Sequence, residues 1–101
     1  MFENINDGDL ITLKLASGEE VVCTLESHGT DIISIKNGLV LMQGPQGLAF
    51  GTFFSTAKQE APINIARDKI TAAAHVNDKI EGEYKKVFSK IKTVDKPKII
   101  V

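Results

Sequence analysis

Hydrophobic and polar residues alternate along most of the first three quarters of the chain, which is the pattern of half-buried β-strands. Apolar side chains recur at every second position in residues 10–16 and 20–27, and again in 48–55. The stretch 31–42 is also mainly apolar, but Asn37-Gly38 interrupts it and predicts one bent or bulged strand instead of two short ones. These four segments predict a protein built mainly from β-structure.

The remaining quarter of the chain predicts a further strand region and one helix. Residues 63–76 contain two alternating runs joined by a short charged connection, 66–69, and predict the last strand or a strand pair. From Asp78 to Ile91 the apolar residues are spaced by three or four, which is the repeat of an amphipathic helix. Asp78 and Glu81 have the spacing of a capping box at the start of this helix.

The composition is that of a single globular domain over residues 1–101, with 43% hydrophobic and 25% charged residues. The one cysteine, Cys23, excludes an internal disulfide and a multi-cysteine zinc site, and its place in an apolar strand predicts a buried thiol. No run reaches the ~20 apolar residues of a membrane span. Because residues 1–9 lack the basic start of a signal peptide, we expect a cytoplasmic protein.

The net charge of −1 excludes a uniformly basic nucleic-acid binder, but it hides an asymmetry. Residues 1–60 contain three Lys and eight acidic residues and carry −5, whereas residues 61–101 contain nine basic and five acidic residues and carry +4. Six of these Lys lie between Lys85 and Lys98. Such polarity can steer a charged partner, and it is also the pattern of a solvated helix face followed by a polar tail.

The order of these segments resembles that of the Sm-like (LSm/Hfq-type) proteins. Residues 8–41 resemble the first Sm motif, with the strand 11–15, the turn glycine Gly18 and later Asn37-Gly38 before a hydrophobic strand. Residues 65–70 resemble the second Sm motif, in which a short charged knuckle joins the last two strands.

The resemblance covers residues 8–76 and has three departures. Cys23 stands where the family usually has Gly, the spacing from Asp31 to Asn37 is longer than usual, and the helix follows the strands, whereas most members begin with a helix. The layout is similar to that of the small Sm-like proteins of tailed bacteriophages, and this resemblance implies a location in the cytoplasm of a bacterium or a phage-infected host cell.

The resemblance implies a five-stranded, strongly bent Sm-like (SH3-type) barrel over residues 8–76, followed by the helix 78–91 and a basic and apolar tail over 92–101. It also implies a homo-oligomeric ring of five to seven subunits, in which strand four of one subunit pairs with strand five of the next. Ring closure is physically reasonable because an open barrel leaves two edge strands and head-to-tail pairing removes both. The residues expected at this subunit interface are Phe50, Phe53, Phe54 and Ile70.

In Sm-like rings single-stranded RNA lines the central pore, so the resemblance implies RNA-binding roles for Lys36, Asn37 and Arg67. An Asn can bond a base edge, and an Arg can stack on a base or pair with a phosphate. The alternatives are a turn or bulge at Asn37 and a surface ion pair between Arg67 and Asp68. His28 lies nearest to the position of the family's stacking residue, but a solvent-exposed turn residue is the simpler interpretation.

The motifs indicate neither catalysis nor a metal or cofactor. His28 and His75 lack the spacing of metal ligands, and Gly44–Gly47 lacks the Lys-Ser/Thr that completes a phosphate-binding loop. We therefore expect a non-enzymatic ring that binds single-stranded RNA in RNA processing or regulation. The alternative is a phage-encoded assembly or scaffold ring that binds protein and has no RNA role. In either case the apolar end of the tail, Pro97–Val101, is expected to pair with a sheet edge or a neighbouring subunit.

Overall fold

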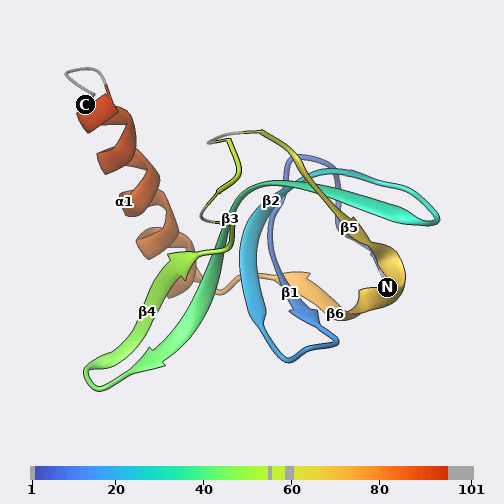
Figure 1. The fold of residues 1–101 in the computed structure, drawn as a ribbon, viewed down its shortest axis with the longest axis horizontal. Coiled ribbons are helices and arrows are strands. Elements are labelled where there is room, and N and C mark those ends of the chain that lie inside the picture. Colours follow the sequence, from blue (N-terminus) through green and yellow to red (C-terminus); the bar gives the residue numbers. More distant parts are fainter. Residues whose placement is uncertain (1, 55, 59–60, 96–101) are drawn as a thin grey trace.

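The computed structural model describes residues 2–54, 56–58 and 61–95, with the backbone alone for 89–95. Six strands form one antiparallel sheet and one helix follows them (Figure 1). The fold is mainly β with a C-terminal helix, as the alternation predicted. The elements are β1 Leu10–Leu15, β2 Glu20–His28, β3 Ile32–Gly44, β4 Gly47–Thr52, β5 Ile63–Ala66, the 3₁₀ turn η1 Arg67–Lys69, β6 Ile70–His75 and α1 Asp78–Asp95.

The strand order is β4-β3-β2-β1-β6, and β5 pairs with the first part of β3. The resemblance implied five strands, and this count is wrong, whereas the strand pair that the alternation allowed for 63–76 is present. Six are present because the region 63–76 is a pair of strands with different partners: β5 pairs with β3 and β6 pairs with β1. In the described part of the chain, β4 and β6 each have one strand neighbour, so the sheet is left open at these two ends.

The predicted bulge in the third strand is confirmed. Opposite Asn37 and Gly38, β2 has one residue, Cys23, because the pairing register shifts between Val22 and Thr24. Asn37 has a φ of 54°, in the left-handed region that Asn tolerates better than most residues. A bulge bends its strand and increases the local twist. The first part of β3 therefore pairs with β5, while the second part pairs with β4.

The core lies on the inner face of the curved sheet. Its residues occupy alternating positions of β1, β2 and β3, and the segment before β1 adds Phe2 and Ile5. Each large apolar side chain buried in this way stabilises the fold by about 1.5–3 kcal/mol. Cys23 is buried among them, as predicted, and burial raises the pKa of its thiol to about 12. The other fully or almost fully buried members are Ile11, Leu13, Val21, Leu25, Ile33, Ile35 and Ile70.

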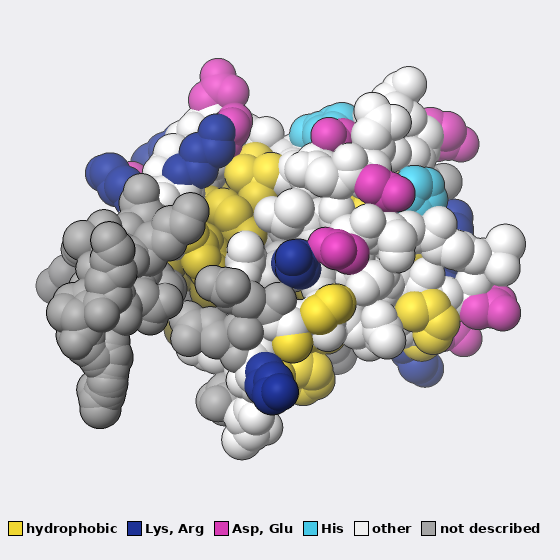
Figure 2. All heavy atoms as spheres, turned by 90° about the horizontal axis from the view of Figure 1, so that it is seen from above, with side chains coloured by type: hydrophobic (Ala, Val, Ile, Leu, Met, Phe, Trp, Pro, Cys, Tyr) yellow, Lys and Arg dark blue, Asp and Glu magenta, His cyan; other side chains and the backbone are white. Residues whose placement is uncertain are grey.

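The helix α1 is fixed to the opposite face of the sheet by Tyr84, which is 5% exposed. The Tyr84 hydroxyl donates a hydrogen bond to the Asn37 carbonyl at 2.8 Å and lies 3.3 Å from the Thr24 hydroxyl. Burial raises the pKa of Tyr84 to about 12, so the hydroxyl stays protonated and can donate. Apolar side chains gather beside the Lys-bearing helix in Figure 2. The helix therefore packs at the β3 bulge.

The cap of α1 differs from the predicted one. The side-chain oxygen of Asn77 accepts a hydrogen bond from the backbone N–H of Ile80 at 2.8 Å, which makes Asn77 the capping residue. The Glu81 carboxylate pairs with Lys85 at 2.8 Å, one turn further along the helix. Glu81 therefore does not form the predicted capping box with Asp78.

The helix is also longer than predicted, ending at Asp95 and not at Ile91. Residues 92–95 contain no Gly or Pro, and the first helix-breaking residue is Pro97. The part of the predicted tail at 96–101 lies outside the described residues. Within the described chain, no helix is long and apolar enough to cross a membrane.

Replacing Tyr84 with Phe keeps the buried ring but removes the hydroxyl that bonds the Asn37 carbonyl. We expect the free energy of unfolding to fall by about 1–2 kcal/mol, because a part-buried acceptor loses its partner. Urea unfolding followed by circular dichroism measures this change. Thr24→Val removes the longer contact at 3.3 Å and is the control with the smaller expected loss. Equal stability of Tyr84→Phe and the unsubstituted protein would contradict the anchoring role.

Candidate nucleic-acid interface

The residues predicted to bind RNA lie in two separate places. Arg67 begins η1 beside the β2–β3 turn: its backbone N–H donates to the Asp31 carbonyl at 2.8 Å, and its guanidinium donates to the Gly29 carbonyl at 2.5 Å. Lys36 and Asn37 lie further along β3, at the bulge. The five residue-to-residue steps from Asp31 to Lys36 correspond to about 17 Å of strand. One copy of the chain therefore does not bring Arg67 together with Lys36 and Asn37.

Three side chains stack at the end of the sheet formed by the β2–β3 turn and η1. The rings of Phe2 and His28 have centroids 5.4 Å apart and an interplanar angle of 24°, and the Arg67 guanidinium carbon lies 5.2 Å from the Phe2 ring centroid. Phe2 is buried, whereas the His28 side chain is 34% exposed. We call Phe2, His28 and Arg67 the aromatic stack. Imidazole and guanidinium planes at a surface are groups on which nucleic-acid bases stack.

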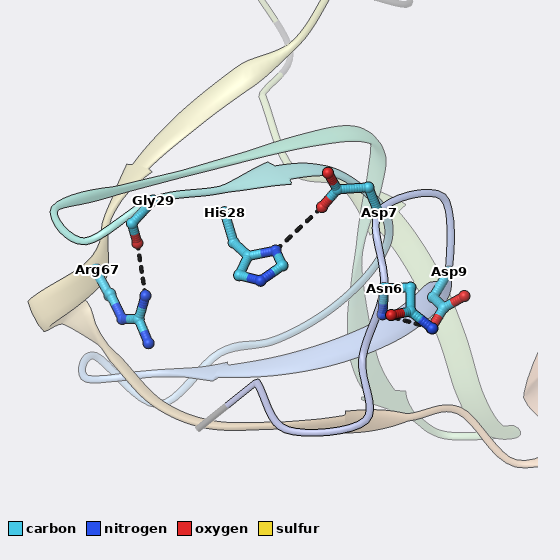
Figure 3. A network of polar contacts seen from close by, with 6 residues as sticks. All are labelled: Asn6, Asp7, Asp9, His28, Gly29 and Arg67. Carbon is cyan, nitrogen blue, oxygen red and sulfur yellow. Dashed lines mark hydrogen bonds and ion pairs between the residues drawn. The ribbon is translucent and has the colours of Figure 1, made fainter.

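The segment before β1 holds the aromatic stack in place (Figure 3). His28 Nδ1 lies 3.0 Å from a carboxylate oxygen of Asp7, and His75 Nε2 lies 2.9 Å from a carboxylate oxygen of Asp9. The backbone of the segment is tied to β2, because the Leu25 N–H donates to the Asp9 carbonyl at 2.9 Å. Both histidines are thus surface residues with carboxylate partners, and the His28 side chain faces the same space as Arg67.

Basic residues do not outnumber acidic residues around the aromatic stack. The two basic residues of η1 are accompanied by three carboxylates, those of Asp7, Asp31 and Asp68. At the bulge, the Lys36 ammonium lies 3.9 Å from the Glu26 carboxylate. On the face seen in Figure 2 the basic side chains are also interspersed with acidic ones. Stacking and hydrogen bonding are therefore the interactions that one copy can offer, and attraction of phosphate contributes less.

The residues predicted at a subunit interface differ widely in exposure. Phe54 is 52% exposed, and its ring stacks on that of Phe53 with centroids 5.1 Å apart. Phe53 is partly buried against the core, and Phe50 is partly buried on β4 opposite Leu41. Ile70 is 4% exposed and belongs to the core of its own chain. Phe54 thus has the most surface available to a neighbouring copy.

Two members of this site, Phe2 and Asp7, were not indicated by the sequence. Both lie in the short segment before β1, for which the alternation predicted no element. Phe2 and Ile5, two apolar residues in an otherwise polar segment, could have indicated that this segment packs on the core, and both are buried. His28 was interpreted as an exposed turn residue; it ends β2 and is partly covered by Phe2.

Ionisation of the Asp9 carboxyl, in the segment before β1, makes the stability of the fold depend on pH. Hydrogen bonds from the Asn6 backbone N–H and from His75 lower the pKa of Asp9 below its ordinary value of 3.8. Because the fold favours the ionised form, this stabilisation is present above pH 3.8 and is lost as the pH falls through the lower pKa of the folded state.

We therefore expect Asp9→Asn to be less stable than the unsubstituted protein at pH 6, with the difference vanishing at pH values well below 3.8. Urea unfolding at a series of pH values measures both curves. Asp68→Asn, which removes a carboxyl from the exposed η1, is the control. A difference for Asp9→Asn that stays constant over the whole series would contradict the linkage.

Comparison with known proteins does not assign the chain to a family. No protein-family model matches the sequence, and no curated protein matches it. The resemblance of residues 8–76 to Sm-like proteins therefore rests on its own motifs and stays a prediction. In the structure, η1, which occupies the position of the charged knuckle in the second Sm motif, contacts the β2–β3 turn through the hydrogen bond from Arg67 to Gly29.

Proposed function

We propose that the protein is a Sm-like subunit of a homo-oligomeric ring that binds single-stranded RNA, in RNA processing or regulation in the cytoplasm. The observation that carries the proposal is the open pairing order of the sheet, with β4 at one end and β6 at the other. The bulge that bends β3 and the tight η1 connection between β5 and β6 support a small SH3-type barrel as the unit of the ring.

The two end strands lack the residues that keep an edge strand from pairing with another chain. Neither β4, Gly47–Thr52, nor β6, Ile70–His75, contains a Lys, Arg, Asp, Glu or Pro. In natural sheets, charged residues and Pro on an exposed edge strand prevent it from pairing with another chain. Because the two edges differ in sequence, pairing of β4 with β6 of a second copy is head-to-tail and repeats until the assembly closes. The exposed side chains of Leu48 and Phe54 flank the β4 edge and support burial there.

RNA binding is proposed at the end of the sheet that carries the aromatic stack. His28 and Arg67 offer planar groups for bases, and a ring repeats the stack in every subunit. Repetition strengthens binding because each further contact is made within one complex. Lys36 and Asn37 lie apart from the stack, so their role in RNA binding is supported by the resemblance alone.

A second candidate function is a ring that binds a protein partner and no RNA. The observation in its favour is the balance of charge around the aromatic stack, where three carboxylates accompany the two basic residues of η1. A site without net positive charge has little of the attraction to phosphate on which most RNA binding depends. The RNA experiment below separates the two candidates.

Ring formation is tested by mass and by amide exchange. Light scattering or native mass spectrometry is expected to give the mass of five to seven subunits. In hydrogen–deuterium exchange, protection of β4 and β6 is expected to rise with protein concentration, since their free edges become paired, whereas protection of the central strands β1 and β2 stays the same. A monomer mass at every concentration would refute the ring.

RNA binding is tested with short U-rich and A-rich oligonucleotides by fluorescence anisotropy at several salt concentrations. We expect micromolar or tighter binding that weakens with salt, and we expect Arg67→Ala to weaken it by about 1–3 kcal/mol, since a stacking plane and a cation are lost. Lys79→Ala removes the same charge from the exposed start of α1 and is the control. No salt-sensitive binding at micromolar protein would favour the ring that binds protein.

A further inference from the structure

A groove of about 480 Å³ lies between the β1–β2 turn and the β3–β4 hairpin. One wall comes from the end of β3 and from β4, and it includes Leu41 and the large apolar side chain of Leu48, which is 58% exposed and lies on the same face of the hairpin as Leu41. The hairpin is closed by a tight turn in which Gly47 has a φ of 111°, so this wall is well defined. Exposed apolar side chains grouped along a groove mark a contact surface.

The opposite wall of the groove is mainly acidic. Glu19 and Glu20 line it at the end of the β1–β2 turn, together with Lys14 from β1. The Glu19 carboxylate accepts a hydrogen bond from the Ser17 hydroxyl, which holds it at the turn. With two carboxylates against one ammonium, this wall favours a basic partner.

The segment of the chain that follows α1 has the complementary chemistry. Residues 96–101 are Lys-Pro-Lys-Ile-Ile-Val, with two cations followed by three β-branched residues. Pro and β-branched residues favour extended backbone, and an extended peptide binds by presenting its side chains to both walls of a groove. We propose that residues 96–101 of one copy bind in this groove of a second copy, with the lysines facing the acidic wall and the β-branched residues facing the apolar wall.

Residues 96–101 of one copy are too short a segment to reach the groove of that same copy. Tyr84 fixes α1 at Asn37, and Asp95 lies eleven residues further along the helix, which is about 16 Å. The five residue-to-residue steps of β3 from Asn37 to Met42 cover about 17 Å. Figure 1 shows that α1 and the β3–β4 hairpin diverge, one upward and one downward. Residues 96–100 span at most about 18 Å, less than the separation that the two diverging elements produce, so a second copy supplies the groove.

This contact goes beyond the proposed ring and does not depend on it. The ring uses the outer backbone edges of β4 and β6, whereas the groove uses side chains of the β1–β2 turn and the β3–β4 hairpin. Two copies are sufficient for the exchange of residues 96–101. In a ring, the same contact would link neighbouring subunits a second time and strengthen the assembly.

Disulfide trapping between two full-length variants tests the proposal. One chain carries Ile100→Cys, and a second chain with a size tag carries Leu48→Cys; the two are mixed and oxidised. Cys23 does not interfere, because it is buried and its thiol pKa is about 12. The control mixture replaces Leu48→Cys with Ile32→Cys, which is 49% exposed at the start of β3. We expect the linked heterodimer to form about tenfold faster than in the control; equal rates would overturn the proposal.

Charge reversal tests which wall faces the lysines. Glu19→Lys with Glu20→Lys in the Leu48→Cys chain is expected to slow trapping several-fold, and Lys96→Glu with Lys98→Glu in the Ile100→Cys chain is expected to restore it. Slowing without restoration would overturn the assigned orientation.

The mass in solution, recorded on the same samples, separates this contact from the ring. Preferential trapping in a protein of monomer mass supports the tail contact and refutes the ring. A ring without preferential trapping refutes the tail contact alone.

Discussion

Opposite Cys23, β3 carries one residue more than β2, and the bend of the sheet begins there. The bend directs the first part of β3 to β5 and the second part to β4, so one edge of β3 serves two partners in succession while β2 pairs with the other edge. The backbone carbonyl of Asn37, at the same bulge, accepts the hydrogen bond from Tyr84. Curvature of the sheet, enclosure of the core and attachment of α1 thus depend on a single position, and a straight β3 would lose all three.

The candidate interface follows from this curvature. Because β5 pairs with the first part of β3, η1 begins beside the β2–β3 turn, and Arg67 reaches the Gly29 carbonyl. The segment before β1 then fills the same end of the sheet with Phe2, on which His28 and Arg67 stack. The bulge itself stays at the other end of this stretch of β3, which explains why Lys36 lies apart from the stack.

The spacing of apolar and polar residues predicted the features that are determined by residues close together in the sequence. Strands β1 and β2 were predicted to within a residue because apolar residues recur at every second position in each, and the bulge was predicted because Asn37-Gly38 interrupts an apolar run. The cap of α1 was misassigned because Asn77 and Asp78 are both good capping residues and spacing alone does not choose between them. The role of Phe2, and the separation of Arg67 from Lys36, depend on how the sheet curves in space, which alternation does not encode.

Most of the positive charge of residues 61–101 belongs to residues other than those that form the aromatic stack. In residues 61–101, η1 contributes two basic residues and one acidic residue, a net +1, and residues 78–88 contain three Lys and three acids, which cancel. The remaining +3 comes from four Lys against Asp95 within 90–98. Most of the positive charge that could attract a partner therefore belongs to residues other than those of the stack, which can recognise planar groups at close range. A partner attracted by charge and a partner recognised by stacking would accordingly use different residues of this chain, and the two carboxylates in the acidic wall of the groove are opposite in charge to the lysines of 90–98.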